Sequence, residues 1–83
     1  MNFTEKQFPQ RVVAELANAR AIHPDLASAH EGYAVILEEL DEFWEEVRKR
    51  KKERDKTRMY EELVQIAAMA QRTAEDVLSE RTG

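Results

Sequence analysis

Two short acidic stretches hold the residues of this chain that are best suited to chemistry. The first, EELDE at 38–42, places Glu39 and Glu42 three residues apart. On a helix they would be neighbours, with Cβ atoms about 5–6 Å apart. Carboxylate oxygens at this spacing can share a hard cation such as Mg²⁺, which takes about six oxygens and often keeps waters and substrate phosphates among them. One helix could therefore supply half of a magnesium site, with Glu38 beside the pair.

The alternative for these acids is an ordinary solvated helix face, because E-x-x-E spacing arises readily by chance in a chain with 36% charged residues. Two of the acids, Glu45 and Glu46, have bases one turn further on and are expected to pair with them at the surface, Glu46 with Arg50. Three acids have no such base on their own helix: Glu38, Glu39 and Glu42. Their mutual repulsion would be relieved by a divalent cation.

The second acidic stretch, EELVQ at 61–65, falls early in another expected helix. Glu62 lies at the margin of the apolar stripe of this helix, and Gln65, three residues on, shares its side. An acid at the edge of a buried face can reach the acids of a partner helix, whereas an acid in the middle of a solvated face cannot. Glu62 is therefore the acid of this stretch that is most informative about function.

These two motifs, in this order on two helices of a short chain, resemble the MazG-like all-α nucleoside triphosphate pyrophosphatases, whose pattern is E-E-x-x-E on one helix and E-x-x-D on the next. The resemblance covers about residues 28–75. It implies that Glu39, Glu42 and Glu62 are metal ligands, with Gln65 at the fourth ligand position. It also implies that Glu38 binds metal or orients the attacking water.

The activity implied by this resemblance is hydrolysis of a (deoxy)nucleoside triphosphate to the monophosphate and pyrophosphate by metal-activated water. Mg²⁺ is the expected ion, with Mn²⁺ as the alternative. The chain departs from the family at Gln65, where the family has aspartate. An amide oxygen brings no charge, so magnesium should be held more weakly, or activity could depend on Glu61 or Glu38 instead. The alternative function is a non-catalytic helical dimer or protein-interaction module descended from this family.

Two breaks in the sequence divide the chain into three helices that must position these acids. The first helix is expected at about 9–21 and ends before HPDL at 23–26, since the residue before a proline is biased away from helix. The second should start at a capping box formed by Ser28 and Glu31 and continue into the basic run that follows it.

A further break is expected within KERDKT at 52–57, with Asp55 or Thr57 capping a third helix that extends to about Ser79. The expected apolar stripe of the second helix is Tyr33, Ile36, Leu37, Leu40, Phe43 or Trp44, and Val47. The expected main stripe of the third is Met59, Leu63, Ile66, Ala67, Ala70, Ala74 and Val77. Apolar residues also lie off these stripes, namely Val35, Tyr60, Val64 and Ala68, and they predict a second buried face.

The chain is therefore expected to be a single all-α domain over 1–83 that associates as a homodimer or homotetramer, with the two long helices of each copy forming a four-helix bundle. It has no cysteine, no apolar leader and no membrane-length apolar run, which predicts a cytoplasmic protein. Its net charge of −4 disfavours nucleic acid as a partner. The basic run RKRKKER at 48–54 is either a solvated helix end or a source of phosphate contacts. The candidates for substrate binding are Arg48, Lys52 and Arg54.

Overall fold

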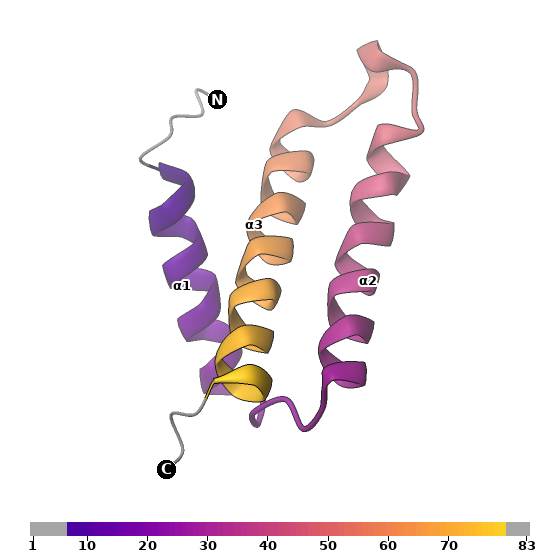
Figure 1. Ribbon diagram of the computed structural model, residues 1–83. Coiled ribbons are helices and arrows are strands. Elements are labelled where there is room, and N and C mark those ends of the chain that lie inside the picture. The colour runs from indigo at the N-terminus through magenta and orange to yellow at the C-terminus, as the bar shows by residue number, and fades with distance from the viewer. Residues whose placement is uncertain (1–6, 80–83) are drawn as a thin grey trace.

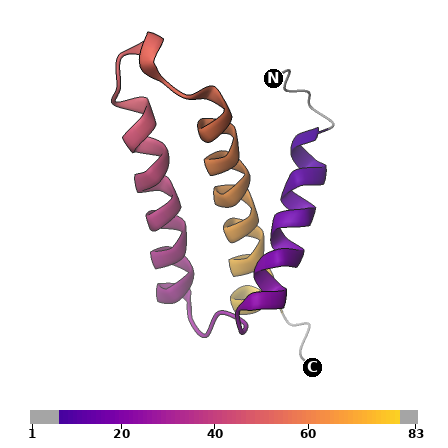
Figure 2. The same cartoon turned by 180° about the vertical axis from the view of Figure 1, so that it is seen from behind.

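Three helices lie side by side in the computed structural model, which describes residues 7–79 (Figure 1). They are α1 (Gln7–Ile22), α2 (Ala29–Val47) and α3 (Lys56–Thr73). Helix α3 lies between the other two and packs against both, an arrangement also visible from behind in Figure 2. The described residues contain no strand, so the expected all-α, three-helix architecture is confirmed. No helix in the described part of the chain is both long and apolar enough to cross a membrane.

The starts of the two long helices follow from short polar side chains. Ser28 is the N-cap of α2, and its Oγ accepts a hydrogen bond from the backbone N–H of Glu31 at 3.1 Å. The Glu31 carboxylate accepts in return from the backbone N–H of Ala27 at 3.1 Å. Asp55 caps α3 by accepting from the backbone N–H of Arg58 at 3.1 Å. Each cap satisfies a backbone donor that the first helical turn leaves without a partner.

Helix α2 ends at Val47, so the expectation that it continues into the basic run is wrong. Arg54 folds back and donates from Nε and Nη2 to the Val47 carbonyl oxygen, at 3.0 and 2.6 Å. The intervening segment forms one 3-10 turn, η1 (Lys51–Glu53). Consecutive bases would repel one another on a continuing helix, and the Arg54 bonds satisfy a carbonyl group that the helix end leaves exposed.

The core gathers around α3, where Val64, Ala68 and Met69 are buried against Val12 and Ala19 of α1. At one end of this core the rings of Phe8 and Tyr60 meet edge to face, with centroids 5.7 Å apart and planes at 86°. This arrangement is the preferred one for aromatic pairs. Val64 and Ala68, which were expected off the main stripe of α3, therefore belong to the buried core, and Tyr60 packs against it.

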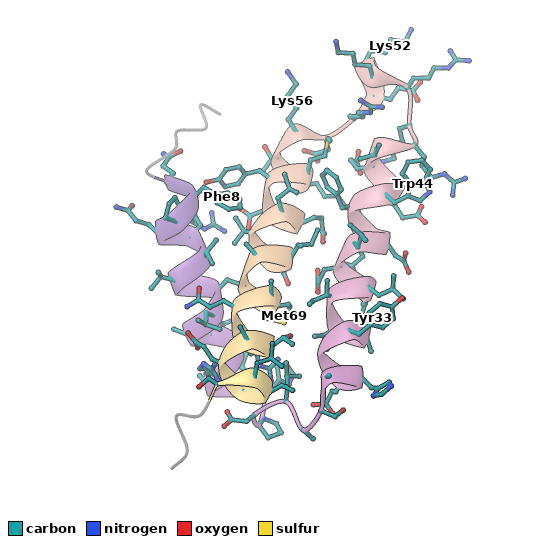
Figure 3. All side chains as sticks on the ribbon, in the orientation of Figure 1. Phe8, Tyr33, Trp44, Lys52, Lys56 and Met69 are labelled. Atoms are coloured by element: carbon teal, nitrogen blue, oxygen red, sulfur yellow. The ribbon has the colours of Figure 1, made fainter. Side chains whose placement is uncertain are left out.

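The face of α2 that meets α3 also differs from the expected stripe. Gly32 and Glu46 are buried, and Val35 packs on the core, whereas Tyr33 and Trp44 of the expected stripe are 66% and 57% exposed. Figure 3 shows Tyr33 on the side of α2 away from α3. The reason is close packing at Gly32, because a Cβ atom built there would lie 2.5 Å from Cγ2 of Thr73. Only glycine lets α2 approach α3 so closely at this turn, and this contact sets which face turns inward.

The C-terminal end of α3 continues as one π-helical turn, η2 (Ala74–Leu78), which anchors the α1–α2 loop. The buried side chain of Asp76 accepts from the backbone N–H of Leu26 at 2.9 Å and pairs with Arg20 at 2.8 Å. Arg72, also buried, donates to the carbonyl oxygen of Pro24 at 2.6 Å. These bonds tie α1, the loop and α3 together at the end of the molecule opposite η1 (Figure 1).

Candidate metal centre and adjoining pocket

Three carboxylates from two helices meet between α2 and α3. Glu39 and Glu42 come from adjacent turns of α2, and Glu62 comes from the second turn of α3. One oxygen of each lies within 4.8 Å of the others, and all three side chains are half-buried. The structure therefore brings together the three acids that the sequence motifs single out. We call Glu39, Glu42 and Glu62 the acidic cluster.

The electrostatics of the acidic cluster are those of like charges held together away from water. Burial, reinforced by the Glu62 and Glu42 carboxylates, raises the pKa of Glu39 to about 8. Burial and the neighbouring Glu42 also raise the pKa of Glu62. One buried oxygen on each of Glu39 and Glu62 accepts no hydrogen bond from any donor in the described chain. Without a cation the cluster is therefore strained, and protonation relieves part of the repulsion.

The acidic cluster fits a magnesium ion in both chemistry and size. Mg²⁺ prefers carboxylate oxygens at about 2.1 Å, so two oxygens that share one ion lie within about 4.2 Å of each other. The separations in the cluster, up to 4.8 Å, need only a sub-ångström shift of flexible side chains to reach that range. A cation would also give the two buried oxygens without hydrogen bonds a partner. Glu39, Glu42 and Glu62 would hold the ion and leave its other positions for waters or phosphate oxygens.

Glu38 and Gln65 lie next to the acidic cluster. Both line a pocket of about 430 Å³ between the three helices, on the side of the cluster nearer the α1–α2 loop. Gln65 is half-buried and one turn along α3 from Glu62, whereas Glu38 is exposed. Glu61, the other acid of the second motif, forms an ion pair with Arg11 of α1 and so faces away from α2.

The pocket beside the cluster has apolar walls and acceptor groups at its margin. The apolar part of the pocket includes Leu26, Val35 and Met69. The pocket is also lined by the carboxylates of Glu15, Glu31 and Glu38. The one arginine that lines it is Arg72. Its guanidinium already donates to the carbonyl oxygen of Pro24, and its Nε lies 3.8 Å from Oδ2 of Asp76. A volume of this size is within the range of small-molecule sites, and no pattern in the sequence indicates that α1 would help to build it.

The three basic residues expected to bind substrate lie around the α2–α3 connection, not beside one another on a helix. Arg48 is exposed and 4.0 Å from Glu45, and Lys52 is exposed in η1 at the top of Figure 3. Arg54 is half-buried, and its guanidinium is occupied by the Val47 carbonyl group. Arg54 therefore has a structural task, while Arg48 and Lys52 are free to meet a ligand.

Sequence reasoning missed Glu46 and Arg58. The expectation that Glu46 lies at the surface is wrong, since its side chain is fully buried. Its carboxylate accepts from the backbone N–H of Asp55 at 2.7 Å and from Lys49 Nζ at 3.0 Å. These bonds lower the pKa of Glu46 and hold the start of α3 against the end of α2. Arg58, 3.7 Å from Glu46, stands exposed one turn before Glu62 on α3. Its i, i+4 spacing to Glu62 was the available signal.

Comparison of the chain with protein-family models, curated proteins and solved structures gives no match. The resemblance to the MazG-like pyrophosphatases therefore rests on the two motifs and stays a prediction. The case for a function depends on the geometry of the acidic cluster and its surroundings.

Proposed function

We propose that this chain is a Mg²⁺-dependent nucleoside triphosphate pyrophosphohydrolase, with Mn²⁺ as an alternative ion. The observation that carries the proposal is the acidic cluster, in which Glu39, Glu42 and Glu62 present oxygens within 4.8 Å of one another. When bound, the ion neutralises phosphate charge and lowers the pKa of a water that attacks phosphorus. The pocket beside the cluster offers space for the rest of a nucleotide.

The residues of the chain have separate tasks in this proposal. Glu39, Glu42 and Glu62 hold the ion, and the exposed carboxylate of Glu38, at the pocket margin, orients the attacking water. Gln65 contributes an amide oxygen from the next turn of α3, without charge. No side chain of the protein needs to act as a nucleophile, since water supplies the attacking oxygen.

The test is release of pyrophosphate from a panel of ribo- and deoxynucleoside triphosphates in the presence of Mg²⁺. We expect Glu42→Gln to lower kcat/KM by at least about 10–100-fold, the loss that is typical even for the outer partners of a metal site. Glu45→Gln is the matched control, because it makes the same chemical change on the same helix at an exposed position outside the cluster. Absence of pyrophosphate release from every triphosphate would refute the proposal.

We propose further that the active form is a homodimer in which α2 and α3 of two copies form a four-helix bundle. The support is the apolar stripe that α2 leaves in solvent. Its exposed members, with Leu63 of α3, are Tyr33, Leu37, Leu40 and Trp44. A domain of about this size buries only about 60% of its unfolded surface, so covering this stripe would add substantially to a marginal stability. A second copy carries the same apolar stripe, as a two-fold symmetric contact requires.

The assembly is tested by light scattering coupled to size exclusion. Leu40→Glu should shift the protein to the mass of a single chain, because an unpartnered carboxylate is costly to bury. Ala34→Glu, also exposed on α2 but outside the apolar stripe, should leave the mass unchanged. A wild-type mass of four chains would favour the tetramer. A single-chain mass at all concentrations would refute self-association.

The second candidate function is a non-catalytic interaction module. The specific observation in its favour is Gln65 at the fourth ligand position, which leaves the site with three carboxylates. Magnesium binding and pyrophosphate release distinguish the two functions. A module would keep the dimer and lack both magnesium binding and pyrophosphate release.

A further inference from the structure

The chemical character of the side chains along α2 and α3 changes from the α1–α2 loop to the α2–α3 connection. At one end lies the pocket with its carboxylates, reaching up to Glu38 and Gln65. The acidic cluster occupies the next turn of both helices. At the other end stand Arg58 and the basic α2–α3 connection. Figure 3 marks the two ends with Met69, which lines the pocket, and with Lys52 and Lys56.

Arg58 is placed to reach a ligand held at the acidic cluster. It lies four residues before Glu62, so it projects from the same side of α3, about 6 Å further along the helix axis. Its side chain is 49% exposed, and within the described residues its one ion pair is from Nη1 to Glu46, at 3.7 Å. The guanidinium therefore keeps most of its five donors for a ligand. Its charge also opposes the rise in the pKa of Glu62, as expected for a close neighbour.

The pocket at the other end suits a nucleoside and not a phosphate. The carboxylates of Glu15, Glu31 and Glu38 repel phosphate, but they can accept hydrogen bonds from base amino groups and ribose hydroxyls. Leu26, Val35 and Met69 offer an apolar surface for a planar ring. Arg72 cannot serve a phosphate there, because it is buried and already bonded to Pro24.

We infer that the substrate binds along α2 and α3 in one direction, with the nucleoside in the pocket and the pyrophosphate end on Arg58. This inference rests on the proposed function and adds the residue that captures the leaving group. In the reaction, the oxygen of water bonds to the α-phosphorus and the bond from that phosphorus to the oxygen bridging to the β-phosphorus breaks. The electron pair of the broken bond leaves with pyrophosphate, and the proton of the water passes to solvent. Arg58 is a substrate-binding residue that stabilises the charge gathering on that leaving group.

The fold should tolerate changes at Arg58, so a variant can report on binding. Glu46 keeps its bonds from Lys49 and from the backbone of Asp55 when the arginine is removed. Arg58→Gln keeps a polar side chain but shortens it, and it removes the charge and the fork of donors. Arg58→Lys restores the charge without the fork. Arg11→Gln is the matched control, because Arg11 is 47% exposed and, like Arg58, pairs with a glutamate, but it lies on α1 and its partner Glu61 faces away from α2.

The decisive measurement is calorimetric binding of pyrophosphate in the presence of Mg²⁺, which does not require turnover. We expect Arg58→Gln to weaken binding about 10–100-fold, as for loss of a charge-assisted hydrogen bond, with partial recovery in Arg58→Lys and no change in Arg11→Gln. Equal binding by wild type and Arg58→Gln, binding by neither, or equal weakening in Arg11→Gln would overturn the inference. A wild type that binds pyrophosphate through Arg58 but releases none from triphosphates would refute only the proposed function.

The nucleoside end is tested at Asn18, an exposed residue of α1 that lines the pocket. Asn18→Trp should obstruct the pocket, and we expect it to weaken binding of the nucleoside monophosphate about tenfold or more while leaving pyrophosphate binding unchanged. Arg58→Gln should show the reverse pattern. A loss of pyrophosphate binding in Asn18→Trp, or unchanged monophosphate binding, would overturn the assigned direction.

Discussion

Replacement of Glu39 by glutamine tests the electrostatics of the acidic cluster directly. The pKa of Glu39 is raised to about 8 by burial and by Glu62 and Glu42. The folded state therefore binds a proton more readily than the unfolded state, so Glu39 contributes stability that is full below the unfolded value of 4.5 and is lost as the pH rises to about 8. Glu39→Gln removes this titration and places an amide donor beside the Glu62 carboxylate. The variant should therefore gain on the wild type as the pH rises.

The size of the effect follows from the shift and from the exposure of the site. One pKa unit corresponds to about 1.4 kcal/mol, but Glu39 is only half-buried and solvent screens the interaction. We therefore expect roughly 1–2 kcal/mol, well below the full conversion. For a domain of this size that is about 5–15 °C in Tm. At a concentration of about 100 times its Kd, Mg²⁺ should stabilise the wild type by about 2.7 kcal/mol.

The assay is thermal unfolding from pH 5 to pH 9, with and without Mg²⁺, followed by circular dichroism. The Tm of Glu39→Gln relative to wild type should rise by about 5–15 °C across this range without metal, and Mg²⁺ should raise the Tm of the wild type far more than that of the variant. Glu45→Gln, an exposed change on the same helix, should follow the wild type. Parallel pH curves for wild type and Glu39→Gln would refute the reasoning about repulsion. Equal stabilisation of both by Mg²⁺ would place the ion elsewhere.

Three further changes test other parts of the structure. Gly32→Ala puts a Cβ atom 2.5 Å from Thr73 Cγ2, so we expect a net loss of up to about 2 kcal/mol in urea unfolding despite better helix propensity. Adding Thr73→Ala should restore most of it, and no restoration would show that the contact is not the cause. Glu46→Gln should flatten the acid limb of the stability curve below pH 4.5, because a lowered pKa gives stability that disappears as the pH falls through the folded value; an unchanged acid limb would contradict the hydrogen bonds assigned to Glu46. Gln65→Asp adds a carboxylate one turn from Glu62, and it should tighten Mg²⁺ binding in calorimetry about tenfold or more if Gln65 occupies a ligand position, whereas unchanged affinity would place this residue outside the site.

The sequence alone determined the local structure and the residues available for chemistry. The cap at Ser28 with Glu31 and the cap at Asp55 are set by side chains that bond to backbone groups three or four residues away. Helical periodicity likewise placed Glu39 and Glu42 on one side of their helix. Such features depend on neighbours in the chain, so the residue types and their spacing are enough to predict them.

The tertiary structure decided which face of each long helix turns inward. Of the expected stripes, Ile36 and Ala67 pack against the core, whereas Tyr33, Trp44 and Leu63 are exposed. Both helices carry apolar residues on two faces, so periodicity could not rank them. Contact between Gly32 and Thr73, and the bonds of buried Glu46 to the start of α3, select the face that carries the acidic cluster. These contacts join residues up to 41 positions apart, and their free energies depend on packing distances that no local pattern records. The same orientation of α2 left Tyr33, Leu37, Leu40 and Trp44 in solvent and brought Glu39 and Glu42 to Glu62.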